Sequence, residues 1–341
     1  MKQHQITIKD IARALGISPS TVSRALKNHP DISEETKQQV RELAANVNYR
    51  PNAVAISLRQ TRTNTLGIVI PEIVHHFFST VISGIDDEAF EQGFSTMICQ
   101  TNESREREKR AVLTLLDKRV DGVLVSVSKT TDDVSHLRAI QDNGTPIVFF
   151  DRICEQIESN RVTSDDYEGA RIAVHHLVDV GCRRIAILRG SDHMLISRQR
   201  RDGYVAALRE HGLEIREDFD IEADSAEGVR AAADKIITIA TEIDGIFAIN
   251  DDTAIAAIKL LQRNSYRVPD DIAVIGFGDG PSSELVSPTL STVQQKGYEI
   301  GREAARMLIA QVKSDLVEVD YETRIFTPVL RQRESTTRNV R

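Results

Sequence analysis

The first 26 residues carry two short helical patterns separated by a turn. Apolar residues recur at helical spacing in the first pattern, at Ile8, Ile11, Ala12 and Leu15. Gly16 suits the left-handed conformation that ends such a helix. Ser18 and Pro19 then predict a second helix, because serine caps helix N-termini and proline fits the first helical position. The pattern predicts a helix-turn-helix, which fits the major groove of DNA.

The second predicted helix is amphipathic. Its inward face consists of Val22, Ala25 and Leu26. The outward residues, all able to donate hydrogen bonds to phosphates or base edges, are Ser20, Thr21, Ser23 and Arg24. A third helix capped at Ser33 would close a small core. For this segment taken alone, a surface hairpin of helices with a polar face is the alternative interpretation.

Residues 53–59 resume a short helical pattern after the break at Pro51. Isolated helices shorter than about 12 residues are marginal in water, so this segment needs a partner to fold. We interpret it as a linker that orders on contact. A permanently frayed linker is the alternative that periodicity leaves open.

From residue 65 the chain alternates between buried strands and amphipathic helices, which is typical of parallel α/β layers. The predicted strands are 66–70, 95–99, 122–127, 147–150, 184–188, 245–249 and 272–277. The predicted helices are 78–92, 105–118, 134–143, 167–180, 198–211, 226–241, 252–264 and 298–312, followed by an extended segment near 323–330. About 270 residues of such units favour two sheets over one.

Polar and aromatic residues follow several of these strands, where α/β proteins bind ligands. They are the segment 71–78, Asp151, Arg152, Asn250, Asp251, Asp252 and Asp279, with Arg198, Arg200 and Arg201 at the start of a helix. Aromatic faces with a few fixed polar groups suit a small polar ring. Each residue has a plain alternative as a helix cap, core residue or surface charge. Their shared position is what favours a binding site.

Charge differs between the two ends of the chain. Residues 1–63 contain ten Lys or Arg against five acids, a net charge of +5, whereas the remainder carries −13. A basic head that meets a polyanion and an acidic body that does not would explain this asymmetry.

The sequence also predicts a cytoplasmic protein. It has no apolar signal core and no apolar run long enough to cross a bilayer. Its three cysteines have no paired spacing, which predicts neither a disulfide framework nor a metal site.

The chain resembles LacI-type transcriptional regulators from about residue 7 to residue 335. The motifs that carry the resemblance are TIKDIARALGISPSTVSRAL, NYRPNAVAISLR, GIVIPEIVHHFFS, VDGVLV, PIVFFDR, VTSDDYEGAR, AIND, DIAVIGFGD and LSTV. The resemblance implies an α/β body of two doubly wound parallel-sheet lobes, similar to periplasmic binding proteins, after a small all-α helix-turn-helix domain. It also implies a homodimer that binds a pseudo-palindromic operator.

The resemblance also divides the chain. We expect a DNA-binding head at 1–50, a hinge helix and linker at 51–64, a body at 65–335 and a tail at 336–341. Three crossovers near Asn160, Leu290 and Thr323 would split the body. One lobe would then hold 65–160 and 291–323, and the other 161–290 and 324–335.

The family's DNA contacts are carried over position by position. Pro19, Ser20 and Arg24 resemble base-reading positions, and Arg24 is expected to carry most of the direct readout, worth about 1 to 3 kcal/mol. Supporting or phosphate contacts are expected from Thr7, Thr21, Ser23 and Asn28. Leu58 matches the leucine that wedges into the minor groove, with Arg59 beside it.

The expected effector contacts lie in the body. They are His75, Phe77, Phe78, Asp151, Arg152, Arg200, Asn250, Asp279 and Gln295. Two departures from the family pattern matter: His75-His76 replaces the usual Asn-Pro, and Gly278 replaces the usual acid. Asp279 is expected to substitute for that acid if the backbone bulges.

The predicted function is therefore a DNA-binding regulator, expected to be a repressor, controlled by a sugar, sugar derivative or nucleobase and needing no cofactor. An α/β enzyme with a fused basic head is the first rival. Phosphate-loop, nucleophile-elbow and zinc-protease motifs are missing from the sequence. A regulator that responds to another protein is the second rival, kept open by the departures at His75 and Gly278.

Overall fold

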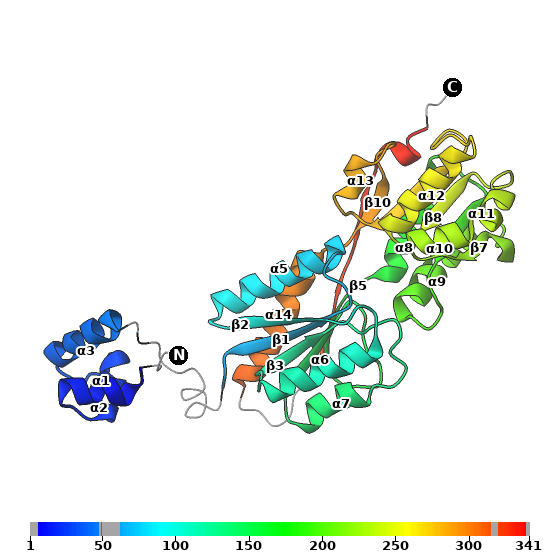
Figure 1. The fold of residues 1–341 in the computed structure, drawn as a ribbon. Coiled ribbons are helices and arrows are strands. Elements are labelled where there is room, and N and C mark those ends of the chain that lie inside the picture. The colour runs from blue at the N-terminus through cyan, green and yellow to red at the C-terminus, as the bar shows by residue number, and fades with distance from the viewer. Residues whose placement is uncertain (1–5, 48, 50–61, 315–319, 339–341) are drawn as a thin grey trace. The chain divides into compact units, whose positions relative to one another are not determined.

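The computed structural model describes residues 6–47, 49, 62–314 and 320–338, which form two compact units, 1–63 and 64–341. The first unit contains α1 (Ile8–Leu15), α2 (Pro19–Leu26) and α3 (Glu34–Asn46) (Figure 1). Its core is made of Ile11, Ala12, Val22, Ala25, Val40 and Ala44. These are the apolar positions whose helical spacing predicted the three helices.

The second unit, which we call the body, contains two six-stranded sheets. The first sheet has the order β11-β5-β4-β3-β1-β2, and all its neighbouring strands are parallel. Its strands are β1 (Thr65–Ile70), β2 (Ser95–Gln100), β3 (Gly122–Val125), β4 (Ile147–Phe150), β5 (Asn160–Ser164) and β11 (Thr323–Phe326). The helices of this first lobe are α5 (His76–Glu91), α6 (Arg105–Asp117), α7 (Ser135–Asp142) and α14 (Gly297–Lys313).

The second sheet repeats this order as β12-β10-β9-β8-β6-β7, with only β12 antiparallel to its neighbour among the described strands. Its strands are β6 (Ile185–Arg189), β7 (Asp220–Glu222), β8 (Gly245–Ala248), β9 (Ala273–Gly278), β10 (Ser291–Gln294) and β12 (Val329–Arg331). The second lobe's helices are α8 (Asp166–Asp179), α9 (Leu195–Glu210), α10 (Ala226–Ala231), α11 (Ala233–Ile239), α12 (Asp251–Arg263) and α13 (Ser282–Leu285), with single 3₁₀ turns at Glu217–Phe219 and Glu334–Thr336.

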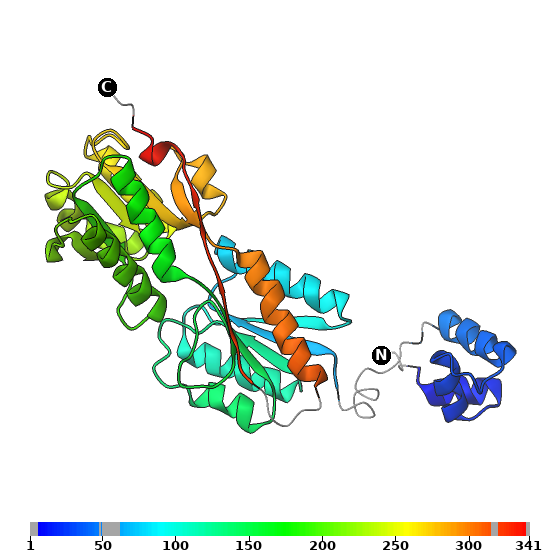
Figure 2. The ribbon, with the colours of Figure 1, turned by 180° about the vertical axis from the view of Figure 1, so that it is seen from behind.

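Close helix contacts build the layers of both lobes. α5 and α14 lie side by side in the first lobe (Figure 2), where a Cβ on Gly84 would stand 2.1 Å from the carbonyl oxygen of Tyr298. Only glycine permits that approach. Buried aliphatic and aromatic side chains fill the space on both faces of each sheet, as parallel sheets require.

The chain crosses between the lobes three times, each time a few residues later than expected. β5 and β11 belong to the first sheet and β10 to the second, so the crossings follow Ser164, Gln294 and Phe326. The expected tail is also corrected at its start. Thr336 is fully buried, with its hydroxyl 2.7 Å from Nε2 of His176, and it belongs to the second lobe.

Three strands were not predicted, and one predicted helix is divided. β5, β7 and β10 are short and partly polar, so they lack the apolar run that identified their neighbours. The helix expected at 226–241 breaks at Ala232, whose backbone lies at φ −92° and ψ 9°. The break lets both halves reach the same core, through Val229 and Ile236.

Candidate DNA-reading head and effector cleft

The head has the geometry that its sequence predicts. Gly16 lies in the left-handed region at φ 65° and ψ 26°, and Ile17 follows it into the corner between α1 and α2. The Ser18 hydroxyl accepts a hydrogen bond from the backbone N–H of Thr21 at 3.0 Å, which caps α2. At the start of α1, the Thr7 hydroxyl donates to Asp10 at 2.7 Å. Thr7 is thus partly committed to its own helix.

The predicted reading face of α2 is largely open. Pro19, Ser20 and Arg24 are exposed, whereas Thr21 and Ser23 are half-buried and suit a supporting role. Arg24 extends into solvent with 58% of its side chain exposed, and its nearest acid, Asp31, is 3.9 Å away. Such a distance leaves the guanidinium available to a base edge.

Three further DNA contacts were predicted, Asn28 in the head and Leu58 and Arg59 in the hinge segment. Asn28 follows α2 with a positive φ of 55°, and its side-chain oxygen accepts a hydrogen bond from Arg41 at 2.9 Å. That bond holds the loop after the predicted reading helix. Leu58 and Arg59 lie outside the residues that the structure describes, as does the rest of the expected hinge helix.

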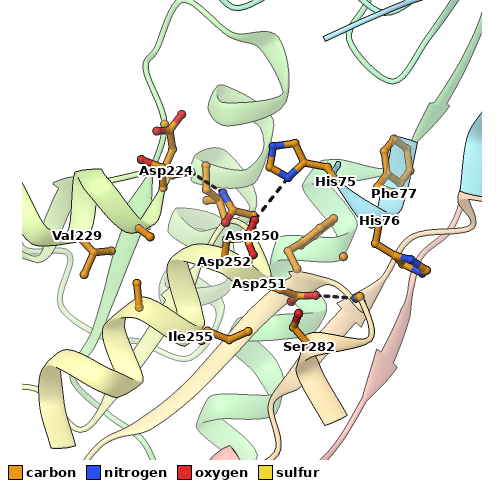
Figure 3. A pocket seen from close by; sticks show the side chains of 18 of the residues that line it. His75, His76, Phe77, Asp224, Val229, Asn250, Asp251, Asp252, Ile255 and Ser282 are labelled. Carbon is orange, nitrogen blue, oxygen red and sulfur yellow. Dashed lines mark hydrogen bonds and ion pairs between the residues drawn. The ribbon is translucent and has the colours of Figure 1, made fainter. Parts of the chain in front are cut away.

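A cleft of about 1520 Å³ lies between the lobes, at the carboxyl ends of the strands of both sheets (Figure 3). The predicted effector contacts that line it are His75, Phe77, Phe78, Asp151, Arg152, Arg200, Asn250 and Gln295. Asp279 is the exception. The structure therefore brings together residues up to 220 positions apart in the chain, as parallel strands ending at one edge predict.

Two phenylalanines form the aromatic part of the cleft in the first lobe. The rings of Phe77 and Phe78, in the first turn of α5, meet edge to face with centroids 5.5 Å apart. Phe78 is 3% exposed and packs into the first-lobe core, whereas Phe77 is half-buried and borders the cavity. Phe77 therefore offers the ring face, and Phe78 supports it.

Arg200 is the most strongly held polar residue of the second lobe. Its Nε and Nη2 lie 2.8 and 2.6 Å from Oδ1 of Asp166, and Nη1 donates to the carbonyl of Ile249. The guanidinium also stacks on Phe277, 3.8 Å from the ring centroid. Both charged groups are buried. Burial is also the main influence on the pKa of Asp166, which it raises despite the opposing effect of Arg200.

Asp151 and Arg152 follow β4 and face different partners. Nη1 of Arg152 lies 2.7 and 2.9 Å from the two carboxylate oxygens of Glu103. Asp151 has a positive φ of 57° and is 6% exposed, and its nearest cation is Nε of Arg152 at 3.9 Å. Burial raises the pKa of Asp151 to about 6. A buried carboxyl with so little compensation is a natural acceptor for a ligand's hydrogen-bond donor.

The residues after β8 line the cleft, and one of them, Asn250, also caps α12. The Asn250 side-chain oxygen accepts from the backbone N–H of Thr253, and its amide donates to the carbonyl of Asp224, both at 2.8 Å. Asp251 is held by Gly280 N–H, Ser283 Oγ and Thr292 Oγ1 at 3.0, 3.1 and 2.5 Å. Burial raises the pKa of Asp251. The alternative interpretation of Asp251 or Asp252 as the helix cap is therefore wrong, since the cap is Asn250.

The expected substitution by Asp279 is wrong. The chain does turn unusually here, with φ 137° at Gly278 and 65° at Asp279, but the turn directs Asp279 to Arg333, 2.8 Å away. Asp279 lines a separate small hollow instead of the cleft. A Cβ on Gly278 would lie 3.3 Å from the Asp251 carboxylate, so Asp251 occupies the space beside the family's usual acid.

Three ion pairs join the lobes, and two of them involve residues that line the cleft; the third links Arg198 to Glu155 at 3.9 Å. His75 lies 2.8 Å from Glu72 in its own lobe and 3.4 Å from Asp252 in the other (Figure 3). The Asp252 hydrogen bond is the main cause that raises the pKa of His75, and Glu72 adds to it against the effect of burial. Lys129 Nζ lies 2.7 Å from Asp224.

The sequence analysis missed three charged residues that form ion pairs with other lining residues of the cleft. They are Glu103, Lys129 and Asp224. Glu103 follows β2, Lys129 follows β3 and Asp224 follows β7. A search of the residues that come after each predicted strand, as was done for Asp151, would have found Glu103 and Lys129. Asp224 would have been found as well if β7 had been predicted.

The described residues supply no sign of a metal centre or a membrane anchor. They contain no group of three His, Cys, Asp or Glu side chains placed to hold a metal ion. Within the same ranges, every helix is too short or too polar to span a bilayer.

Known proteins share both parts of this arrangement. Residues 7–52 match the family described as bacterial regulatory proteins, lacI family, and residues 174–336 match the periplasmic binding protein-like domain. The HTH-type transcriptional repressor PurR of Vibrio campbellii is 32% identical over 321 residues, which cover 94% of this chain and 95% of that protein. PurR of Actinobacillus pleuropneumoniae is 29% identical over 330 residues, covering 96% and 98%.

Solved structures give the same result over the whole length. The lac repressor dimer bound to operator and the anti-inducer ONPF has a TM-score of 0.84 at 25% identity, covering 98% of this chain and 99% of that one. The transcriptional regulator CelR in complex with cellobiose has a TM-score of 0.74 at 27% identity, covering 97% and 99%. The chain therefore belongs to the lacI family of bacterial regulatory proteins, as an effector-controlled DNA-binding transcriptional repressor and not an enzyme.

Proposed function

We propose that this protein binds a pseudo-palindromic operator as a homodimer in the cytoplasm, associated with the nucleoid when bound, and that a small polar metabolite in the cleft sets its operator affinity. The observation that carries the proposal is the cleft itself. It lies between two lobes that are joined by three chain crossings and by the ion pairs His75–Asp252, Lys129–Asp224 and Arg198–Glu155. A ligand that contacts both lobes changes their relative angle.

The coupling follows from differential binding. A ligand that binds one lobe angle more tightly shifts the population toward it, and operator DNA must then shift ligand affinity by the same factor. Couplings of this kind are typically about 1 to 3 kcal/mol. In the proposed dimer the lobe angle sets the spacing of the paired hinge segments, from which Leu58 would enter the minor groove with Arg59 beside it.

We assign base reading to Pro19, Ser20 and Arg24, and backbone or supporting contacts to Thr7, Thr21, Ser23 and Asn28. The open face of α2 supports this assignment, since the Arg24 side chain is 58% exposed. Pro19 and Ser20 are short, so Arg24 is the residue that reaches farthest into the groove. The effector contacts proposed are those lining the cleft, with Asp279 removed.

The test of the DNA-reading assignment compares two exposed arginines of the head. Arg24→Ala should lower the preference for the selected operator over a scrambled duplex by roughly 5- to 150-fold, the worth of one bidentate base contact. Arg13→Ala removes the same charge from α1, where 82% of the side chain is exposed, and should leave that ratio unchanged. Competition binding with operators selected from random duplexes measures both. Full preference in Arg24→Ala would refute the assignment.

A further inference from the structure

The loop 128–131, which we call the Lys129 arm, carries one end of the shortest ion pair between the lobes. Lys129 Nζ donates to Asp224 Oδ2 at 2.7 Å, whereas the other two described pairs span 3.4 and 3.9 Å. The two side chains are 40% and 31% exposed. Ion pairs this exposed usually contribute little, because holding two side chains in one geometry costs entropy. This pair can matter only if the fold already orders both ends.

The fully buried Glu108 of α6 fixes the arm on both sides of Lys129. Its Oε2 accepts the backbone N–H of Ser128 at 2.6 Å, and its Oε1 accepts the Thr131 hydroxyl at 2.8 Å. His136 Nε2, in the first turn of α7, lies 2.8 Å from the same Oε1. Moving the arm away would leave a buried carboxylate short of donors, which is unfavourable.

The segment after β2 adds three further contacts to the arm. Glu103 Oε2 accepts the backbone N–H of Lys129 at 2.8 Å, and the Glu103 carbonyl accepts the Thr130 hydroxyl at 2.8 Å. The hydroxyl oxygens of Thr101 and Ser128 lie 2.6 Å apart. Side chains and carbonyls of the first lobe therefore hold the whole arm, and Lys129 extends from a fixed backbone.

The second lobe holds the other end of the pair. Asp224 follows β7, and its carbonyl accepts the Asn250 side-chain amide at 2.8 Å (Figure 3). The next residue, Ser225, caps α10 by accepting the N–H of Gly228 at 3.1 Å. Because the backbone at both ends is already ordered, this pair loses less entropy than an ordinary exposed pair. A change of lobe angle must also stretch the bond, since neither backbone can follow the other.

We propose that Lys129 and Asp224 form a latch that favours one angle between the lobes, and that Glu108 is the positioning residue that sets Lys129 for it. This inference rests on the proposed function, in which the lobe angle sets operator affinity, and it names one regulator of that angle. Glu108 does not line the cleft, so it acts through the arm and not through an effector.

A double-mutant cycle measures the latch on the full chain without an effector. Lys129→Met, Asp224→Asn and the double variant are compared with wild type by urea unfolding of the body. We expect a coupling of about fivefold in the unfolding equilibrium constant, the upper end of the range for exposed ion pairs. Lys118→Met, at an exposed lysine of the same lobe, should show no coupling to Asp224→Asn. Independent effects of Lys129→Met and Asp224→Asn would overturn the latch.

The same cycle in a Glu108 background isolates the positioning role. Glu108→Gln replaces one acceptor oxygen with a donor, so the coupling should fall below twofold, whatever the stability of that variant by itself. Thr131→Val removes a single bond to Glu108 and should also reduce the coupling, which keeps the test open if Glu108→Gln does not fold. Glu106→Gln, exposed on the same helix, should leave the coupling intact. Full coupling in the folded members of this set would overturn the role of Glu108.

Operator binding separates this inference from the proposed function. Lys129→Met and Asp224→Asn should change the affinity for the selected operator in the same direction, by up to about fivefold, and the double variant should change it no further. Effects that multiply in the double variant would overturn the latch. A coupling that depends on Glu108, with operator affinity unchanged in both single variants, would keep the latch and overturn the control of operator affinity by the lobe angle.

Discussion

The two lobes share one strand order but hold their cleft residues by different means. In the second lobe Arg200, Asn250 and Asp251 are fixed by bonds to their own lobe, including the carbonyl of Ile249 and the backbone N–H of Gly280. In the first lobe Phe77 and Phe78 are positioned by packing, and the Asp151 carboxylate accepts no hydrogen bond among the described residues.

This difference indicates which part of effector recognition each lobe supplies. The second lobe presents polar groups that are already oriented, so a ligand need not order them. The first lobe presents an apolar face and the buried Asp151 carboxyl, whose nearest cation is 3.9 Å away, and both gain most when the cleft closes on a ligand. Substitutions in the second lobe should therefore lower the stability of the fold and the affinity for the effector together. Substitutions in the first lobe should be able to lower one of these quantities without the other.

The largest effect is expected at the buried pair of the second lobe. Arg200→Met leaves Asp166 buried without its cation and should lower the free energy of unfolding by about 3 to 5 kcal/mol, besides abolishing effector binding. The double variant Arg200→Met with Asp166→Asn should recover most of the stability but not the binding. Urea unfolding of the second lobe measures the stability of both variants, and ligand titration measures their effector binding. Unchanged stability in the single variant would contradict the pairing argument.

The neighbouring phenylalanines of the first lobe should separate folding from binding. Phe78→Ala removes a ring that is 3% exposed and should cost about 3 to 5 kcal/mol of stability. Phe77→Ala, at the cavity border, should cost less than half as much while weakening the effector at least as strongly. Denaturation midpoints beside binding isotherms give the comparison. Equal stability losses in the two variants would show that both rings belong to the core.

The smallest effect is expected at the His75–Asp252 contact between the lobes. The pKa of His75 is raised in the folded protein, so its stabilising contribution is complete below the ordinary histidine pKa of about 6.5 and is lost as pH rises through the raised value. His75 is 46% exposed, so solvent limits the contribution to roughly 1 kcal/mol or less.

Melting curves of wild type and His75→Gln test this sign. The variant should melt a few degrees lower at pH 6, the shift expected for about 1 kcal/mol, and at the same temperature at pH 9. His193→Gln, at an exposed histidine that lies in the second lobe, is the matched control. A variant that melts like wild type at pH 6 would remove His75 from the contacts that join the lobes.

Local signals predicted much of this protein from sequence. Gly16 at the turn, the caps at Ser18 and Ser33, and the alternation of apolar strands with helices act within a few residues, so the sequence determined the head and the α/β class. The strand-end rule also predicted that most of the expected effector contacts lie at one cleft, because parallel strands bring their carboxyl ends to one edge.

Only the tertiary structure decided which groups pair across long stretches of chain. Arg152 meets Glu103, Asp251 meets Thr292, and Asp279 turns to Arg333 and away from the cleft. The short strands β5, β7 and β10 exist because neighbouring strands supply their hydrogen bonds, and their own residues give little apolar signal. Electrostatic and ladder partners lie far apart in sequence, so these pairings could be determined only after the chain had been folded.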